Sequence, residues 1–376
     1  MSIFIQIIRL FIEHWILNVI QFWFNYPVYF LKRIWNYDDL HHTSIDQYQS
    51  MQYCKLTRSI PYGFHPREKF HLLEPTQHTK IRGNLFYVHG GGFVTSCREM
   101  YYNSFTYLCR RGYRVFIVDY PLSPQSRHPY PTLSILRCLN YLRSNTKWKI
   151  KELHMIGDSA GANLILLATS IIQNSNIQLH FQRFLSSKES ATMSKYIYPR
   201  ILSCISIYGM ISKKIGSQAS FPMGLGLSFL WQCITNYNND DDAEIFPVSF
   251  DDVLEFFLSS GNGDAKMNFP PVQFLVGDKD PLLQDSLFVY NKMKSNHYTT
   301  ELHVYQGGFH GFFGVPPDWQ LGRWKLACRP CSEDIYAFLN TYTVEPRSTK
   351  ISLMGQRTIG NDWFGVIVIS QLVIVM

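Results

Sequence analysis

Short apolar runs alternate with longer segments of helical pattern between residues 84 and 343. Strands are predicted at residues 152–156, 201–207, 271–276 and 300–305, and residues 271–276 have the pattern of a buried strand. A helix is predicted to begin near residue 162, directly after the first of these runs. Strands that alternate with helices are typical of a mostly parallel, doubly wound sheet with helices on both faces. The sequence therefore predicts an α/β fold.

Two stretches between these elements lack a clear period. Residues 187–195 are polar, and we expect a surface loop there. Residues 211–262 fall where such a fold commonly inserts a lid, and they hold aromatic residues and an acidic run. These residues are Phe221, Phe229, Leu230, Trp231, Asp240, Asp241 and Asp242. The aromatic side chains either line a pocket beneath the lid or belong to the ordinary core, whereas the acidic run is expected to be solvated and to hold no metal.

The N-terminal residues 1–35 are rich in Ile, Phe, Trp and Leu. The stretch from His14 to Leu31 is uncharged, and Lys32 and Arg33 follow it. Its length is about 18 residues, which is near the lower limit for a transmembrane helix. This pattern predicts either a membrane anchor or interfacial helix, or part of a cap over the active site. The first reading makes the protein membrane-associated, for example at the endoplasmic reticulum, and the alternative is a cytoplasmic protein.

The C-terminal tail, residues 344–376, ends in an apolar, β-branched run. That run spans about 13 residues and is too short for a transmembrane helix. The sequence assigns no function to this tail.

Composition narrows the choice of partners. Charged residues make up 17% and aromatic residues 15% of the 376 residues, against about 25% charged residues in typical soluble chains. This excess of apolar surface favours an apolar pocket, a membrane face, or both. The net charge of +7 is spread thinly, and its densest cluster, residues 147–151, is interpreted as a solvated face, so no nucleic-acid partner is expected.

Eight cysteines are present, and only Cys328 and Cys331 have a motif spacing, C-x-x-C. A single pair of this kind without a second pair is weak evidence for zinc. We therefore predict no metal site and leave disulfides open.

The chemistry centres on Gly157-Asp158-Ser159-Ala160-Gly161, a G-x-S-x-G motif. A predicted strand precedes it and a predicted helix follows it, as in a nucleophile elbow. The turn exposes the Ser159 hydroxyl at the carboxyl edge of the sheet, where open α/β sheets bind ligands. His89-Gly90-Gly91-Gly92, about 70 residues upstream, has the form of an oxyanion loop.

A serine nucleophile needs a base and an orienting acid, which follow it in the order acid, then histidine. His310 lies in a glycine-rich loop after the strand at 300–305, whereas His303 lies inside that strand and is interpreted as structural. Asp278 and Asp280 both follow the strand at 271–276, and spacing alone does not separate them. His89 is interpreted as shaping its loop.

Together these motifs resemble the hormone-sensitive-lipase-like family of serine esterases, which includes arylacetamide deacetylases and related membrane esterases. The resemblance covers about residues 80–343 and includes residues 280–285, which read DPLLQD, and residues 118–124, which resemble the family's D-Y-R-L-A-P segment. It implies an α/β-hydrolase fold and identifies the acid as Asp280, directly before Pro281 and Leu282. Pro121, Ser123 and Ala162 depart from the family pattern, but none of these departures removes a catalytic group.

The resemblance and the motifs together predict a serine carboxylesterase or lipase-like hydrolase that needs no cofactor. Ser159, Asp280 and His310 are the expected triad, and the backbone N–H groups of Ala160, Gly91 and Gly92 are the expected oxyanion hole. The expected substrate is a small-molecule or lipid ester, with a membrane surface as a further partner. A catalytically silent ligand receptor on the same fold is the alternative. The expected domains are residues 1–35 as a membrane or cap segment, residues 80–343 as the hydrolase domain with a lid at about 211–262, and the tail.

Overall fold

The computed structural model of the chain describes residues 53–76, 81–217, 223–235, 246–259, 268–313 and 323–343. The predictions for residues 1–35, Phe221, the acidic run at 240–242 and the tail lie outside these ranges. The side chains of Phe229 and Cys328 are likewise not described.

An eight-stranded sheet forms the centre of the described part, in the order β1-β2-β4-β3-β5-β6-β7-β8. Strand β2 pairs antiparallel with β1 and β4, and every other pairing is parallel. This confirms the predicted mostly parallel sheet. The strands are β1 Cys54–Pro61, β2 Lys69–Pro75, β3 Gly83–Val88, β4 Tyr113–Val118, β5 Glu152–Asp158, β6 Arg200–Ile207, β7 Val272–Gly277 and β8 Thr300–Tyr305.

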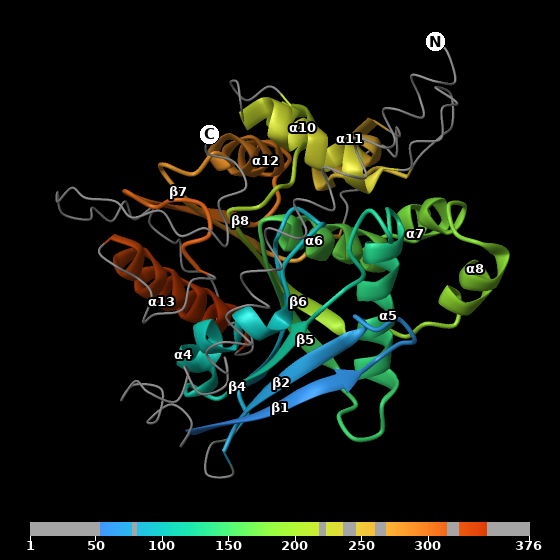
Figure 1. The fold of residues 1–376 in the computed structure, drawn as a ribbon, viewed down its shortest axis with the longest axis horizontal. Helices are drawn as coiled ribbons and strands as arrows, with labels where there is room; N and C mark the ends of the chain where they lie inside the picture. The colour runs from blue at the N-terminus through green and yellow to red at the C-terminus, as the bar shows by residue number, and fades with distance from the viewer. Residues whose placement is uncertain are drawn as a thin grey trace.

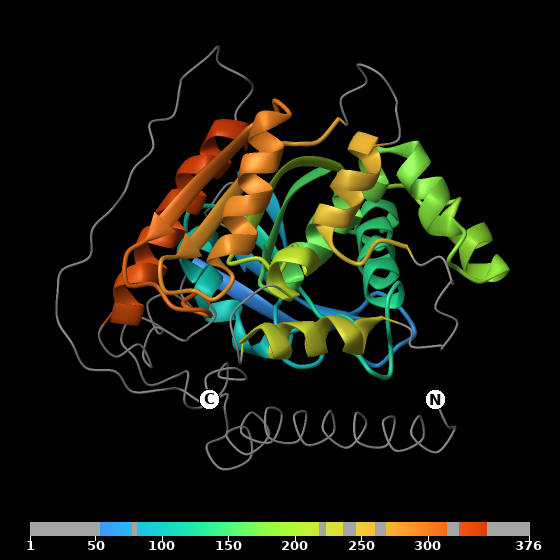
Figure 2. The same cartoon turned by 90° about the horizontal axis from the view of Figure 1, so that it is seen from above.

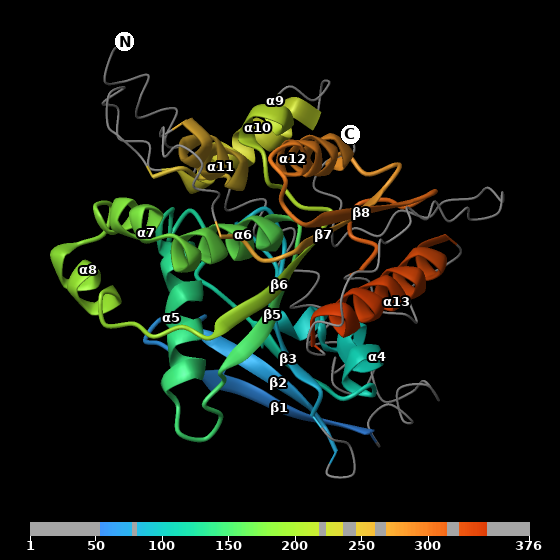
Figure 3. The same ribbon diagram turned by 180° about the vertical axis from the view of Figure 1, so that it is seen from behind.

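Helices cover both faces of the sheet (Figures 1 and 3). Helices α5, α6 and α12 pack on one face in a core that includes Met155, and α4 and α13 pack on the other in a core that includes Ile156. Adjacent residues of β5 thus face opposite layers, which is why buried parallel strands carry continuous apolar runs. The helices are α4 Thr106–Cys109, α5 Tyr130–Ser144, α6 Ala160–Gln173, α7 Ser175–Gln182, α8 Ser187–Met193, α9 Lys213–Ser217, α10 Met223–Ile234, α11 Phe250–Ser259, α12 Leu283–Ser295 and α13 Arg323–Thr343.

The prediction of a loop at residues 187–195 was wrong, because helix α8 occupies Ser187–Met193. Its start is a capping box in which the Ser186 hydroxyl accepts the Glu189 N–H and the Glu189 carboxylate accepts the Ser186 N–H. Met193 is the buried residue of this helix. With so small an apolar stripe, the helix leaves little periodic signal in the sequence.

Strands β1 and β2 precede residue 80, where we expected the hydrolase domain to begin. They form the antiparallel edge of the sheet, with β2 paired to β4 from Phe70 to Leu73. A disulfide between Cys54 and Cys109 joins β1 to the end of α4. The sequence had left this pairing open.

Helices α9, α10 and α11 lie between β6 and β7 in the chain, within the segment expected to form a lid. In Figures 1 and 3, α10 and α11 lie beyond one end of the sheet, and Figure 2, which looks down on that end, shows them in front of the strands. Trp231 of α10 is buried against Phe93, with ring centroids 5.7 Å apart. None of the helices in the described ranges combines the length and the apolar character needed to cross a membrane.

Candidate active site

The sharp turn at Ser159 connects β5, which ends at Asp158, to α6, which begins at Ala160. Ser159 has φ 49° and ψ −119°, a conformation that costs a non-glycine residue about 1–3 kcal/mol and is typical of functional sites. Backbone hydrogen bonds hold it there, since its N–H donates to Ile207 (2.9 Å) and its carbonyl accepts from Met210 (3.0 Å). Gly161 must lack a side chain, because a Cβ there would lie 2.1 Å from the carbonyl oxygen of Val88.

The structure brings the three predicted triad residues together at the carboxyl edge of the sheet. His310 Nε2 lies 3.1 Å from Ser159 Oγ, and His310 Nδ1 lies 3.1 Å from each carboxylate oxygen of Asp280. Ser159 follows β5, Asp280 follows β7 and His310 follows β8. This arrangement connects a hydroxyl, an imidazole and a carboxylate in the order that proton abstraction from serine needs.

Asp278, the other candidate acid, faces a different group. Its Oδ1 accepts the Gly307 N–H at 2.6 Å, and its side chain is 30% exposed. The side chain of Asp280, by contrast, is fully buried beneath His310. Asp278 thus fixes the turn that leads into the histidine loop, and Asp280 faces the imidazole.

The surroundings of His310 favour its protonated form. Burial alone would lower the pKa of the imidazole, but the charge of Asp280 and its hydrogen bond outweigh burial and raise the pKa above 6.5. The ring of Tyr208 packs edge-on against the imidazole, with centroids 4.8 Å apart. Asp280 therefore stabilises the imidazolium that forms when His310 takes a proton.

The predicted oxyanion donors come from two elements. Ala160 is the first residue of α6, where helical N–H groups have no partner within the helix. Gly91 and Gly92 follow β3 with φ values of 102° and 58°. Among the described residues, neither glycine N–H donates to a backbone carbonyl. Helix α10 covers this site, since a Cβ on Gly92 would lie 3.0 Å from both methyl carbons of Leu230.

Asp158 lies beside Ser159, and the sequence analysis gave it no role. Its buried Oδ1 accepts hydrogen bonds from the Tyr87 hydroxyl (2.5 Å) and the Gly90 N–H (2.7 Å). Burial raises the pKa of this carboxyl, and the bond from Tyr87 opposes the rise. Asp158 therefore ties the nucleophile turn to the glycines of the oxyanion loop. It occupies a variable position of the G-x-S-x-G motif, so the motif gives no signal for it.

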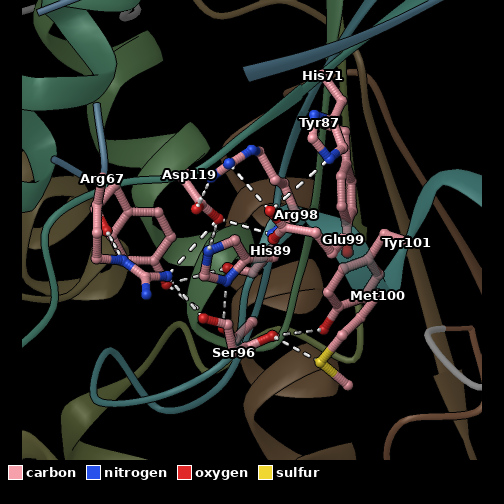
Figure 4. A network of polar contacts seen from close by, with 12 residues as sticks. Arg67, His71, Tyr87, His89, Ser96, Arg98, Glu99, Met100, Tyr101 and Asp119 are labelled. Carbon is pink, nitrogen blue, oxygen red and sulfur yellow. Dashed lines mark hydrogen bonds and ion pairs between the residues drawn. The ribbon is translucent and has the colours of Figure 1, made fainter. Parts of the chain in front are cut away.

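Asp119, which belongs to the segment 118–124, is the centre of a buried polar network (Figure 4). Arg67, His89 and Arg98 surround its carboxylate. His89 lies with Nε2 3.0 Å from Asp119 and Nδ1 2.8 Å from the Gly90 carbonyl oxygen, and it is fully buried. Both ring nitrogens thus face neighbouring oxygens, an arrangement that suits a residue that shapes the loop.

Asp285 is a second buried carboxyl near the triad. It lies in the first turn of α12 and accepts the Ser212 N–H at 3.3 Å. Burial raises its pKa to about 8. Asp285 connects α12 to the turn after β6, and the Met210 N–H of that turn donates to Ser159. Within the described ranges, no group of three or more histidine, cysteine or acidic side chains is arranged to hold a metal ion.

Comparison with known proteins supports ester hydrolysis. A family model described as alpha/beta hydrolase fold matches residues 85–314, more than half of the chain. The acetyl esterase of Salmonella typhi is 23% identical over 285 residues, which cover 75% of this chain and 76% of that protein.

Solved structures share the fold at low sequence identity. Esterase B from Lactobacillus rhamnosis has a TM-score of 0.61 at 16% identity, covering 78% of this chain and 87% of that chain. A bacterial heroin esterase has a TM-score of 0.56 at 16% identity, covering 82% and 90%. An esterase from the bacterial hormone-sensitive lipase family has a TM-score of 0.54 at 17% identity, covering 80% and 90%.

Proposed function

The chain belongs to the alpha/beta hydrolase family and is an ester hydrolase, and from this premise we propose that Ser159 forms the acyl-enzyme. The observation that supports this most strongly is the continuous line of hydrogen bonds from Ser159 Oγ through His310 to Asp280. The strained backbone at Ser159 is a second, independent sign of function.

The first half of the reaction follows from this geometry. His310 Nε2 takes the hydroxyl proton of Ser159 as the oxygen attacks the ester carbonyl. Asp280 keeps the proton of His310 on Nδ1 and stabilises the positive charge that appears on the ring. The negative charge on the former carbonyl oxygen is met by the N–H groups of Ala160, Gly91 and Gly92, each worth about 10²–10³ in turnover for donors of this kind.

Collapse of the tetrahedral intermediate breaks the ester C–O bond, and His310 returns its proton to the departing alcohol. Water then enters, and His310 removes its proton as the oxygen attacks the acyl carbonyl on Ser159. The second collapse releases the carboxylic acid and restores the serine hydroxyl. No cofactor takes part in these steps.

We propose short acyl chains as the preferred substrates. The Salmonella relatives are acetyl esterases, and esterase B has been captured with a C4-C4 SN3 tributyrin phosphonate. Here Leu230 packs directly over Gly92, and Ser159 is only 5% exposed. Both features limit the room beside the proposed oxyanion hole. A series of p-nitrophenyl esters tests this: kcat/KM should fall as the acyl chain lengthens beyond butyrate, and a maximum at long chains would contradict it.

Replacing Ser159 tests the nucleophile. Ser159→Ala and His310→Ala should each lower ester turnover by about 10⁵–10⁶-fold, because triad members act as a unit. Ser170→Ala is the matched control, since this buried serine lies on α6, the helix that follows Ser159, and its hydroxyl donates to the Leu166 carbonyl (2.9 Å). Near-normal turnover by Ser159→Ala would contradict the mechanism. The alternative function, a catalytically silent ligand receptor, gains no support, because the relatives named above are esterases.

Membrane association remains a proposal that concerns residues 1–35. Its support is the uncharged run from His14 to Leu31, followed by Lys32 and Arg33. Such a segment would hold the hydrolase near lipid-dissolved esters.

A further inference from the structure

We propose that Asp119 is a positioning residue that fixes the oxyanion loop, residues 89–98, and that Arg67 locks this arrangement from the β1–β2 turn. The inference rests on the proposed function, because it concerns the donors that stabilise the ester's oxyanion. Neither residue touches the proposed reacting atoms. Their effect would pass through the backbone of Gly91 and Gly92.

One carboxylate contacts residues at both ends of this loop. At its start, His89 Nε2 lies 3.0 Å from Asp119 Oδ1. At its end, the Arg98 N–H donates to Asp119 Oδ1 at 2.7 Å, and the Arg98 guanidinium donates to Oδ2. Asp119 is only 2% exposed. The loop is therefore closed onto a single buried anchor, as Figure 4 shows.

Arg67 binds the loop near its end as well as its anchor. Its Nη2 donates to the Ser96 carbonyl at 2.6 Å and lies 3.6 Å from Asp119 Oδ1. Its Nε donates to the Tyr120 carbonyl at 3.0 Å. Arg67 thus joins the loop to the segment after β4. It lies outside residues 85–314, the part of the chain that matches the family model.

The electrostatics agree with an ionised anchor. Burial alone would raise the pKa of Asp119, but Arg67, then His89 and Arg98, outweigh burial and hold the pKa well below its usual range. Hydrogen bonds to a charged group are about twice as strong as neutral ones. A charged Asp119 therefore stiffens the loop more than a neutral side chain of the same shape.

Stiffness matters here because oxyanion donors stabilise the transition state only when they are already aimed at the developing charge. Asp158 holds Gly90 from one side through the bond to its N–H. Asp119 and Arg67 hold the two ends and Ser96. Removing the contacts of Asp119 or Arg67 should let the backbone N–H groups of Gly91 and Gly92 drift, that is, move away from the position of the developing charge. That drift weakens binding of the transition state more than binding of the substrate.

Arg67→Met is the decisive variant, since the Arg67 side chain is 28% exposed and its removal leaves Arg98 and His89 on the anchor. Arg114→Met is the matched control: Arg114 is 22% exposed and forms an ion pair with Glu74 (2.9 Å) between β4 and β2. The measurements are kcat and KM for p-nitrophenyl acetate, the inhibition constant of a short alkyl trifluoromethyl ketone, and thermal unfolding. This ketone forms an oxyanion when serine adds to it, so it reports on the donors directly.

We expect Arg67→Met to lower kcat by about 10-fold to 10²-fold. This is no more than the effect of removing one oxyanion-hole donor, which lowers kcat by about 10²-fold to 10³-fold. The ketone should bind more weakly by a similar factor, while KM changes by less than about twofold. Asp119→Asn should have a larger effect in the same direction, and Arg114→Met should behave as wild type.

A folded Arg67→Met that keeps wild-type kcat and ketone affinity would overturn the inference, as would an equal loss in Arg114→Met. Wild-type protein with no ester turnover would overturn the proposed function as well. An active wild type with an unchanged Arg67→Met would overturn only the positioning role.

Discussion

Asp280→Asn preserves the shape of the side chain beside His310 and removes its charge. Both Asp280 oxygens lie 3.1 Å from His310 Nδ1 in a fully buried position. When His310 accepts the serine proton, an ion pair forms across this distance, worth about 5 kcal/mol at an effective dielectric constant of about 20. Losing about 5 kcal/mol from the transition state corresponds to about 10⁴-fold in kcat. The same loss follows this substitution in the serine protease triad.

Asp278→Asn is the control from the same loop. Its Oδ1 accepts the Gly307 N–H, and the asparagine oxygen can still accept that bond. Because its side chain is partly exposed, the lost charge is well solvated. We expect a cost below about tenfold, in line with about 1 kcal/mol for one perturbed hydrogen bond.

Initial rates with p-nitrophenyl acetate measure both variants, and circular dichroism confirms that both are folded. The two effects should differ by about three orders of magnitude, following the estimates of ionic and neutral interactions above. If Asp278→Asn proved the more damaging, or if Asp280→Asn stayed within about tenfold of wild type, the assignment of the acid would be wrong.

Three further predictions follow from the charges and the sequence. Only neutral His310 can act as the base, so kcat/KM should rise with pH through a midpoint above 6.5; a midpoint below 6.5 in a pH–rate profile would contradict the raised pKa of His310. His303 is partly buried, which alone would lower its pKa, but Asp334 and Glu301 raise the pKa to about 9. The bonds of protonated His303 should therefore stabilise the fold fully below about pH 6.5, by no more than about 3 kcal/mol, and this stabilisation should disappear as pH rises through about 9. Urea unfolding of the wild type and of His303→Gln at several pH values checks this, and the same pH dependence of stability in both proteins would refute it. Deleting residues 1–35 should release the protein from membranes and leave turnover of a short ester nearly unchanged; recovery of the full-length protein in the soluble fraction would rule out the anchor.

Strands β6 and β7 were predictable because each is largely apolar, and β5 and β8 because apolar residues recur between their polar ones. Strands β5, β6, β7 and β8 begin and end within about two residues of the predicted segments. Strands β1 and β2, at the antiparallel side of the sheet, were not predicted. Strand β1, at the outer edge, is made of exposed and partly buried residues after the buried Cys54. Helix α8 was missed because its stability comes from a capping box more than from a wide apolar stripe.

The three residues of the proposed triad could be picked out from the sequence because each is marked by a motif or by its place after a strand. Spacing left Asp278 and Asp280 open, since both follow β7 within a few residues. Their difference is the direction of the side chain, which only the folded turn determines. Asp119 and Arg67 are 52 positions apart, and their contact depends on how β1 and β2 lie on the sheet. No local pattern records such a contact.

Covalent labelling of Ser159 tests the central claim most directly. Incubation with a short alkyl p-nitrophenyl phosphonate, followed by intact mass and peptide mapping, should give one adduct on the peptide that contains Ser159. Labelling should be lost in Ser159→Ala and strongly slowed in His310→Ala, because Ser159 needs His310 to remove its proton. An adduct on another residue of an active enzyme, or full ester turnover after Ser159 is completely labelled, would contradict the account.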